Sequence, residues 1–224
     1  MLCTLLPGGH VVIMPKFEAG DWLAHAERWC ATHATLVPVG YQRLVEHREL
    51  ARFDLGSLRS LMSCGSPLHP PLKKRLIDAF RCEIVELYGL TEGIITTLDP
   101  EDAAEKLASV GKPAPGTDLL LLGDDERPVP VGATGEILGL SRFVMNGYHG
   151  RPDATREATW VDARGRTWLR TGDIGRLDED GYLYVVDRKK DMILSGGQNV
   201  YPADLEAVLA QHPAVSECAV VGVP

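Results

Sequence analysis

The chain has 224 residues, 45% of them hydrophobic, which is enough to bury the core of one large domain or two small ones. Its formal net charge of −8 and pI near 5.4 argue against a nucleic acid or an acidic membrane surface as partner, so small molecules are expected instead. Five scattered cysteines, none in a Cys-x-x-Cys pair, indicate neither a disulfide framework nor a zinc site and favour a reducing, cytoplasmic setting, and no segment approaches the ~18 apolar residues of a membrane span.

The first part of the chain alternates apolar runs with helical patterns. Strands are predicted at residues 11–14, 35–39 and 58–62, and helices after Asp21, Gly40 and Pro70. A further buried strand is predicted at 84–85, with a tight loop from Tyr88 to Glu92. This rhythm predicts an α/β layer with a mainly parallel sheet.

From residue 99 the composition of the chain changes. Residues 99–109 form a charged, solvated segment, and 111–187 carry short apolar runs separated by turn signals, which predicts a small, mostly antiparallel, barrel-like β subdomain. The last part is predicted to hold a strand at 192–194, a Gly-Gly turn, a helix begun by Pro202 and a strand at 219–223. Because both ends of the chain are apolar, we expect it to be a piece of a longer protein.

The stretch Glu86-Leu87-Tyr88-Gly89-Leu90-Thr91-Glu92-Gly93 offers a ring, a hydroxyl and a carboxylate within eight residues. Tyr88 could stack on a base, Thr91 could donate to a phosphate, and Glu92 could hold Mg²⁺. By the strand-end rule, this stretch and Gly65-Ser66-Pro67 would both lie at carboxyl edges of strands, where such sheets bind ligands. A polar loop with a partly buried tyrosine fits the octapeptide equally well.

Two later segments have possible roles. In Arg170-Thr171-Gly172-Asp173, the aspartate could accept from the two hydroxyls of a ribose, although a capped turn is the simpler interpretation. The run Asp187-Arg188-Lys189-Lys190-Asp191 interrupts two apolar strands and reads as a solvated linker, which is also a candidate hinge.

The order and spacing of these motifs, together with Gly135-Glu136 and Ser195-Gly196-Gly197-Gln198-Asn199, resemble the motif series of the adenylate-forming (AMP-binding) superfamily. The resemblance runs essentially end to end and is greatest to the fatty-acyl and aryl CoA ligases. It implies domains at 1–110 (the α/β part of the large domain), 111–187 (its β subdomain), 188–190 (a hinge) and 191–224 (the start of a small α+β C-terminal domain).

The resemblance also implies roles for residues of this chain. Those implied to enclose or contact the nucleotide are Gly65, Ser66, Pro67, Glu86, Leu87, Tyr88, Gly89, Thr91, Asp173 and Arg188, with Asp173 and Arg188 on the ribose. Glu92 is the implied Mg²⁺ ligand, Lys190 the hinge, and Ser195, Gly196 and Gly197 the loop beside the pantetheine of coenzyme A. The acyl pocket is implied near residues 38–41, Leu90, Gly93 and Ile94.

The activity implied by the resemblance joins a small carboxylic acid to ATP, giving acyl-AMP and pyrophosphate, and then to CoA. The family's Pro-Lys-Gly phosphate loop and its carboxylate-contacting lysine have no counterpart in these 224 residues, so we expect this chain by itself to be inactive in adenylation. Alternatives are an enzyme that loads a carrier protein, a non-catalytic AMP-binding module and a purely structural α/β piece. The identity of the acid and the oligomeric state are left open.

Overall fold

A computed structural model describes residues 2–103, 105–195, 198–210, 212, 214–215 and 218–223. The chain forms two compact units. Unit 1 comprises Met1–Tyr88 and Leu98–Ala108, and unit 2 comprises Gly89–Thr97 and Ser109–Pro224. No helix in the described part of the chain is long and apolar enough to cross a membrane.

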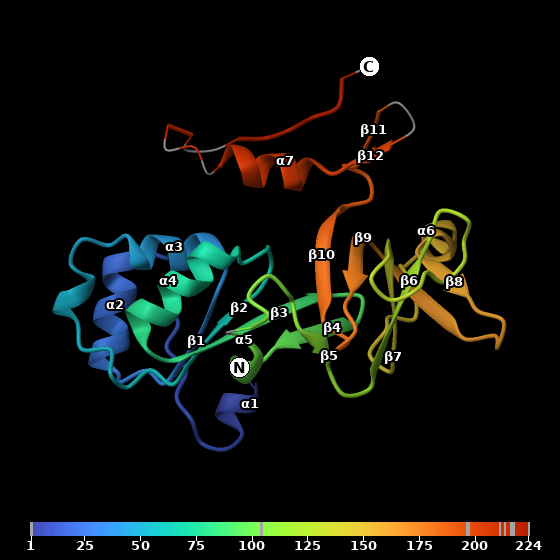
Figure 1. Cartoon of the computed structure of the whole chain (residues 1–224). Helices are drawn as coiled ribbons and strands as arrows, with labels where there is room; N and C mark the ends of the chain where they lie inside the picture. The colour runs from blue at the N-terminus through green and yellow to red at the C-terminus, as the bar shows by residue number, and fades with distance from the viewer. Residues whose placement is uncertain are drawn as a thin grey trace. The chain divides into compact units, whose positions relative to one another are not determined.

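Unit 1 is an α/β layer in which three parallel strands lie side by side (Figure 1). In chain order it contains α1 (Leu2–Leu5), α2 (Ala19–Arg28), β1 (His33–Leu36), α3 (Pro38–Val45), a 3-10 turn (Leu50–Arg52), β2 (Ser60–Ser63), α4 (Pro70–Phe80), β3 (Glu83–Leu90) and α5 (Pro100–Ala103), with Gly89 and Leu90 of β3 assigned to unit 2. The register aligns His33 with Ser60 and Ser60 with Glu83. The predicted α/β layer and its parallel strands are therefore confirmed.

The core of unit 1 forms where α2, α3 and α4 pack on these strands. Leu23 of α2, Leu44 of α3, Leu76 of α4 and Leu61 of β2 are completely buried in one apolar cluster. Each helix begins without a side-chain cap, but α3 and α4 begin with proline at the first helical position, where the missing N–H has no cost. Burial of one apolar face, and not local capping, therefore holds these helices in place.

Some element boundaries differ from the sequence expectations. Residues 11–14 form no strand, and Val12 and Ile13 are exposed, because among the described residues no neighbouring strand pairs with them. The second strand ends at Leu36, since Pro38 already begins α3. The tight loop expected from Tyr88 starts later: β3 continues to Leu90, and Gly93 supplies the positive φ of +120°.

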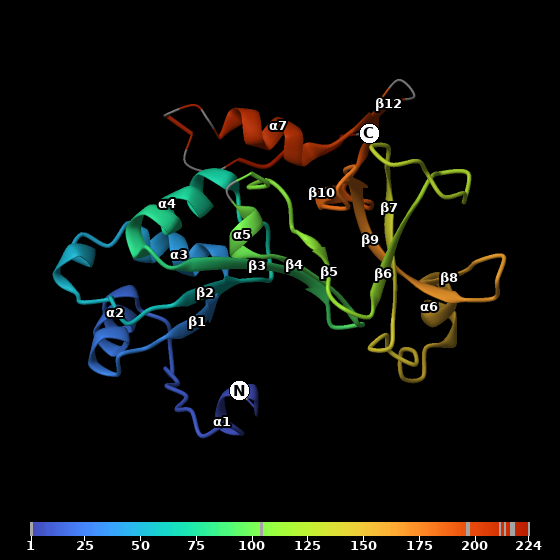
Figure 2. The ribbon, with the colours of Figure 1, turned by 60° about the horizontal axis from the view of Figure 1, so that its bottom comes forward.

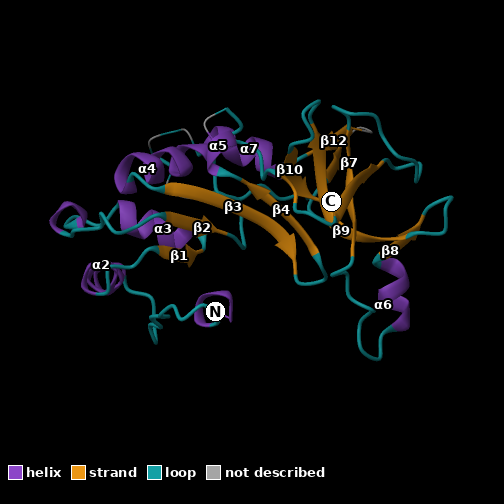
Figure 3. Cartoon of the chain, turned by 90° about the horizontal axis from the view of Figure 1, so that it is seen from below, coloured by secondary structure: helices purple, strands orange, loops and turns teal. Residues whose placement is uncertain are grey.

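Unit 2 is an antiparallel β structure with a curled five-stranded sheet (Figure 2). Its elements are β4 (Ile94–Leu98), β5 (Lys112–Pro113), β6 (Thr117–Leu122), β7 (Thr134–Ser141), α6 (Pro152–Glu157), β8 (Thr159–Val161), β9 (Thr167–Leu177), β10 (Leu183–Arg188), β11 (Ile193–Ser195), β12 (Gln198–Val200) and α7 (Pro202–Leu209), with Leu98 itself assigned to unit 1. The sheet order is β10-β9-β7-β6, and β8 pairs with β9. Figure 3 shows how strands dominate this unit, with α6 beside β8.

The β subdomain expected from the turn signals is confirmed, and Leu122, Leu138 and Trp168 form its buried cluster. The helix begun by Pro202 is confirmed as α7. The prediction of a strand at 219–223 is wrong, because these residues have no ladder partner among the described residues. An apolar run makes a strand only where another strand lies beside it to accept and donate hydrogen bonds.

Candidate functional site

The loop Gly65-Ser66-Pro67 lies at the carboxyl end of β2, as the strand-end rule predicts. All three residues are exposed, and Gly65 has a φ of +90°, a left-handed conformation that glycine adopts without strain. Leu68, directly after the loop, is buried. The loop is therefore exposed along its three residues, and the chain returns to the core at Leu68.

On β3, the residues expected to face a nucleotide have different environments. Glu86 is buried and forms an ion pair with Lys73 of α4, with 2.5 Å between Oε2 and Nζ. Leu87 and Tyr88 are half-buried, and Gly89 is exposed. Glu86 thus has a protein cation as its partner, while Tyr88 remains partly accessible for stacking.

The turn after β3 holds Thr91, which is exposed, and Glu92, which is half-buried. The backbone oxygen of Glu92 accepts from the N–H of Met145 across 2.8 Å, and its carboxylate accepts from the hydroxyl of Tyr148 across 2.9 Å. That hydrogen bond to Glu92 raises the pKa of Tyr148. The segment 141–148 therefore holds both the backbone and the side chain of Glu92 in place.

Asp173 and Arg188 lie directly opposite each other on β9 and β10. Nε of Arg188 lies 2.9 Å from Oδ1 of Asp173, and the aspartate side chain is 5% exposed while that of the arginine is 57% exposed. Gly172 has a φ of +73°, and its carbonyl accepts from the N–H of Lys189 across 2.9 Å. The structure therefore brings together two residues that the sequence places fifteen positions apart.

A second charged cluster lies beside this pair. One carboxylate oxygen of Glu136 on β7 accepts from Arg170 across 2.7 Å and from Lys189 across 2.8 Å. Arg170 also pairs with Glu126. The Glu136 side chain is 7% exposed, and it joins β7 to β9 through Arg170 and to the charged run through Lys189, whose side chain is 45% exposed.

The expected hinge and pantetheine loop are only partly described. Lys190 and Ser195 are both exposed, whereas Gly196 and Gly197 lie outside the described residues. Just before the hinge, Oδ2 of Asp187 accepts from the N–H of Ala203 in the first turn of α7, across 3.0 Å. This contact joins the end of β10 to α7.

The residues expected near an acyl pocket are mostly in the cores of the two units. Tyr41 is completely buried in unit 1, where its hydroxyl donates to the carbonyl of Met62 across 2.7 Å and burial raises its pKa. Ile94 is completely buried in unit 2 and packs on Gly139. Val39 of the same expected set is 56% exposed, and an acyl pocket near these residues stays a prediction.

The donor set around Glu92 fits a magnesium ion that also binds phosphate. The described residues contain no group of three or more His, Cys, Asp or Glu side chains that could hold a metal. Mg²⁺ normally binds through one or two carboxylates together with substrate phosphates and water, so a single carboxylate is sufficient.

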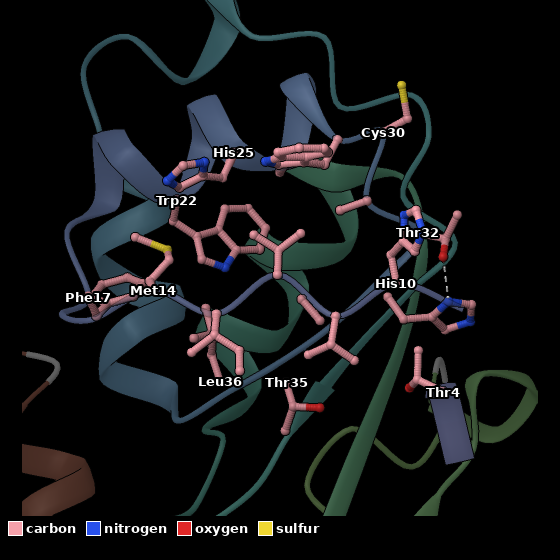
Figure 4. A pocket seen from close by; sticks show the side chains of 18 of the residues that line it. Thr4, His10, Met14, Phe17, Trp22, His25, Cys30, Thr32, Thr35 and Leu36 are labelled. Atoms are coloured by element: carbon pink, nitrogen blue, oxygen red, sulfur yellow. Dashed lines mark hydrogen bonds between the residues drawn. The ribbon is translucent and has the colours of Figure 1, made fainter. Parts of the chain in front are cut away.

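A cavity of about 910 Å³ lies along β1 in unit 1, beneath Trp22 and His25 of α2 (Figure 4). Met14 and Phe17 close one end, and Thr32 contacts the ring of His33 near the other, with 2.9 Å between its hydroxyl and Nδ1. None of the residues predicted to bind nucleotide lines this cavity. Its position at the edge of the sheet distinguishes it from the strand-end loops.

Sequence reasoning missed Lys73, Tyr148 and the contacts of Glu136. A signal for Lys73 was available, because it lies three residues before Leu76 and seven before Phe80, on the apolar face of α4. For Tyr148 no local pattern exists, since its partner is 56 residues away in the sequence.

Comparison with known proteins finds a matching family model and curated relatives that are named as CoA synthases or ligases. A family model described as AMP-binding enzyme matches residues 1–149. A feruloyl-CoA synthase from an Amycolatopsis species is 42% identical over all of this chain and 45% of its own length. A long-chain-fatty-acid–CoA ligase from Mycobacterium tuberculosis is 39% identical over all of this chain and 44% of its own length. The chain thus spans less than half the length of these curated relatives.

Solved structures of adenylate-forming enzymes also match the fold of this chain. The amide bond synthetase of Marinactinospora thermotolerans matches with a TM-score of 0.89 at 38% identity, over 99% of this chain and 44% of that protein. The o-succinylbenzoate CoA synthetase of Bacillus subtilis, in complex with its acyl-adenylate intermediate, matches with a TM-score of 0.86 at 34% identity, over 99% of this chain and 44% of that protein. The chain belongs to the AMP-binding enzyme family, the adenylate-forming enzymes.

Proposed function

We propose that this protein is an ATP-dependent acyl- or aryl-CoA ligase that forms acyl-AMP and pyrophosphate from a carboxylic acid and ATP, and then a thioester with CoA. The observation that carries the proposal is the contact between Asp173 and Arg188, because the two residues assigned to the ribose lie opposite each other on adjacent strands. The relatives named as CoA ligases of aromatic and fatty acids support the reaction class.

The exposure of the other residues supports the roles that we propose for them. The exposed loop of Gly65, Ser66 and Pro67, with the half-buried Leu87 and Tyr88 and the exposed Gly89, suits contact with adenine. Thr91 is exposed and can donate its hydroxyl to a phosphate. The carboxylate of Glu86 forms an ion pair with Lys73. We therefore propose that Glu86 supports the nucleotide site without contacting the nucleotide itself.

Glu92 is the proposed ligand of Mg²⁺, held in place by Tyr148. When bound, the ion would offset the negative charge of the triphosphate as the carboxylate of the acid approaches. Thr91, adjacent in the same turn, would orient the phosphate that is attacked.

Lys190 is the proposed hinge, and Ser195 with Gly196 and Gly197 the proposed pantetheine loop. Attack by the acid and attack by the thiol require different groups at one small site, so a rotation at Lys190 would exchange them. In a protein of the relatives' full length, Lys190→Pro should impair thioester formation far more than adenylation, because proline restricts the backbone at that position. Equal loss in both half-reactions would remove Lys190 from this role.

The acceptor can be identified by one experiment on a protein of the relatives' full length. Acyl-AMP formed in place would be offered CoA, a carrier protein bearing phosphopantetheine, or a simple amine, and the acylated product would be measured by mass spectrometry. We expect CoA to be the acceptor. Acylation of the carrier or of the amine alone would contradict that assignment.

Binding of AMP to the 224-residue chain tests the proposal directly. We expect calorimetry to detect AMP binding, Asp173→Asn to weaken it by about tenfold, and Asp118→Asn, at an exposed position of β6, to leave it unchanged. No binding, or equal binding by both variants, would contradict the assigned ribose contact. We also expect no acid-dependent ATP–pyrophosphate exchange by this chain alone.

The five free cysteines support a reducing compartment such as the cytoplasm.

A further inference from the structure

Lys73 is the unexpected residue in the core of unit 1. It lies on the inner face of α4 with Leu76 and Phe80, and its side chain is 1% exposed. Lysine is almost never buried to this extent unless its charge is paired. The group that pairs with it therefore indicates why it is there.

The contacts of Lys73 and Glu86 tie four segments together. Nζ of Lys73 lies 2.5 Å from Oε2 of Glu86 on β3 and donates to the carbonyl of Leu107 across 2.7 Å. The other carboxylate oxygen, Oε1 of Glu86, accepts from the N–H of Leu68 across 3.1 Å. One carboxylate thus holds α4 with one oxygen and the end of the Gly65–Pro67 loop with the other.

These contacts join the two segments that we assign to adenine. Leu68 directly follows Gly65-Ser66-Pro67, and Glu86 directly precedes Leu87 and Tyr88. The two strands already run in register, with Ser63 opposite Glu86, but that ladder ends at Ser63, before the loop begins. The carboxylate of Glu86 therefore sets the position of the loop relative to Tyr88 where the sheet no longer does.

Stability alone is a weak reason for such a pair. Removing two charges from water costs about as much as their attraction returns, and apolar residues of similar size usually serve equally well. What an ion pair with defined hydrogen bonds adds is a fixed geometry, since the carboxylate must satisfy the lysine and the Leu68 amide together.

We propose that Lys73 and Glu86 are positioning residues for nucleotide recognition: Lys73 orients the Glu86 carboxylate, and the carboxylate holds the Leu68 amide so that the Gly65–Pro67 loop is preformed for adenine. This inference rests on the proposed nucleotide site. It assigns the carboxylate of Glu86 to the protein's own amide and ammonium groups instead of to the ligand.

Two double variants with the same charge separate positioning from stability. Lys73→Met with Glu86→Gln keeps a carbonyl oxygen that can accept from Leu68, whereas Lys73→Met with Glu86→Leu removes the acceptor. Both remove the ion pair, so each leaves no unpaired buried charge. Folding would be compared by circular dichroism and urea unfolding, and AMP affinity by calorimetry on the full 224-residue chain.

We expect both variants to fold, the glutamine variant to bind AMP within about threefold of the original chain, and the leucine variant to bind about tenfold more weakly. Equal AMP affinity of the two folded variants, whether retained or lost, would overturn the proposal. Absence of AMP binding by the original chain would count against the proposed function and not against this contact.

Hydrogen exchange of the unaltered chain tests the contact without mutation, and so covers the case in which a variant does not fold. A preformed loop requires the Leu68 amide to exchange slowly before AMP is added and to change little afterwards. Fast exchange without AMP would show that Glu86 does not hold the loop, and the inference would then be wrong.

Discussion

The hydroxyl of Tyr148 donates to Oε1 of Glu92 across 2.9 Å and joins residues 56 positions apart in the sequence. Glu92 sits in the turn between β3 and β4, and Tyr148 lies in the segment between β7 and α6. Together with the hydrogen bond from Met145 to the Glu92 carbonyl, this contact gives the proposed metal ligand a fixed orientation.

Replacing Tyr148 by phenylalanine should weaken Mg²⁺-dependent nucleotide binding. Loss of one hydrogen bond worth about 1 kcal/mol should raise the Mg²⁺ concentration for half-maximal ATP binding by roughly fivefold. Tyr184→Phe is the matched control, because the Tyr184 hydroxyl donates to Asp178 across 3.1 Å. A Mg²⁺ titration at constant ATP measures both, and equal curves for the two variants would contradict the role of Tyr148.

Glu136→Gln should destabilise unit 2. One oxygen of Glu136 accepts from both Arg170 and Lys189, and the carboxylate is buried, so its neutralisation leaves two cations without their common partner. Because the lysine side chain is 45% exposed and solvent screens part of the effect, we expect a loss of about 1–2 kcal/mol in the free energy of unfolding.

Urea unfolding provides the measurement for Glu136. Asp153→Asn is the control, because the ion pair of Asp153 with Arg156 is 79% and 77% exposed on its two sides and should contribute less than about 0.5 kcal/mol. If the two variants lose the same free energy of unfolding, the Glu136 cluster stabilises the fold no more than an exposed ion pair does.

Gly93→Ala should disrupt the turn that carries Glu92. A Cβ atom at this position would lie 2.2 Å from the backbone oxygen of Phe143, and φ is +120°. We expect a loss of about 2–4 kcal/mol by urea unfolding. Gly116→Ala separates the two causes, since its φ is +85° but nothing lies within 4 Å, and it should cost only about 1 kcal/mol. If both variants lose the same free energy of unfolding, the backbone at Phe143 can move to accommodate the added Cβ atom, and the steric contact is not the cause.

Cys82 should react slowly with iodoacetamide. Burial, and secondly the charge of Glu83, raise the pKa of its thiol, so less thiolate is present at pH 8 and the rate should climb as the pH rises through the displaced pKa. The exposed Cys30 is an internal reference. Mass spectrometry of timed samples resolves the two sites, and Glu83→Gln should accelerate Cys82. Faster labelling of Cys82 than of Cys30 would contradict this expectation.

Local patterns predicted most of the elements. The period of the apolar residues after Pro70 placed α4, and the turn signals within residues 111–187 separated the strands of the β subdomain. The patterns were wrong at residues 11–14 and 219–223. Both runs are apolar enough for a strand, but a strand also requires a neighbour beside it, and that information is not local.

The amino-acid sequence alone determined the family, the parallel and antiparallel parts of the fold and the residue types available for a nucleotide, because these depend on periodicity and on motif spacing along the chain. Tertiary structure decided which groups meet: Arg188 with Asp173, Tyr148 with Glu92, and Lys73 with Glu86. Such pairings depend on strand register and on how each helix faces the sheet. Packing sets both, so a carboxylate that reads as a ligand in the sequence can instead hold the loop beside it.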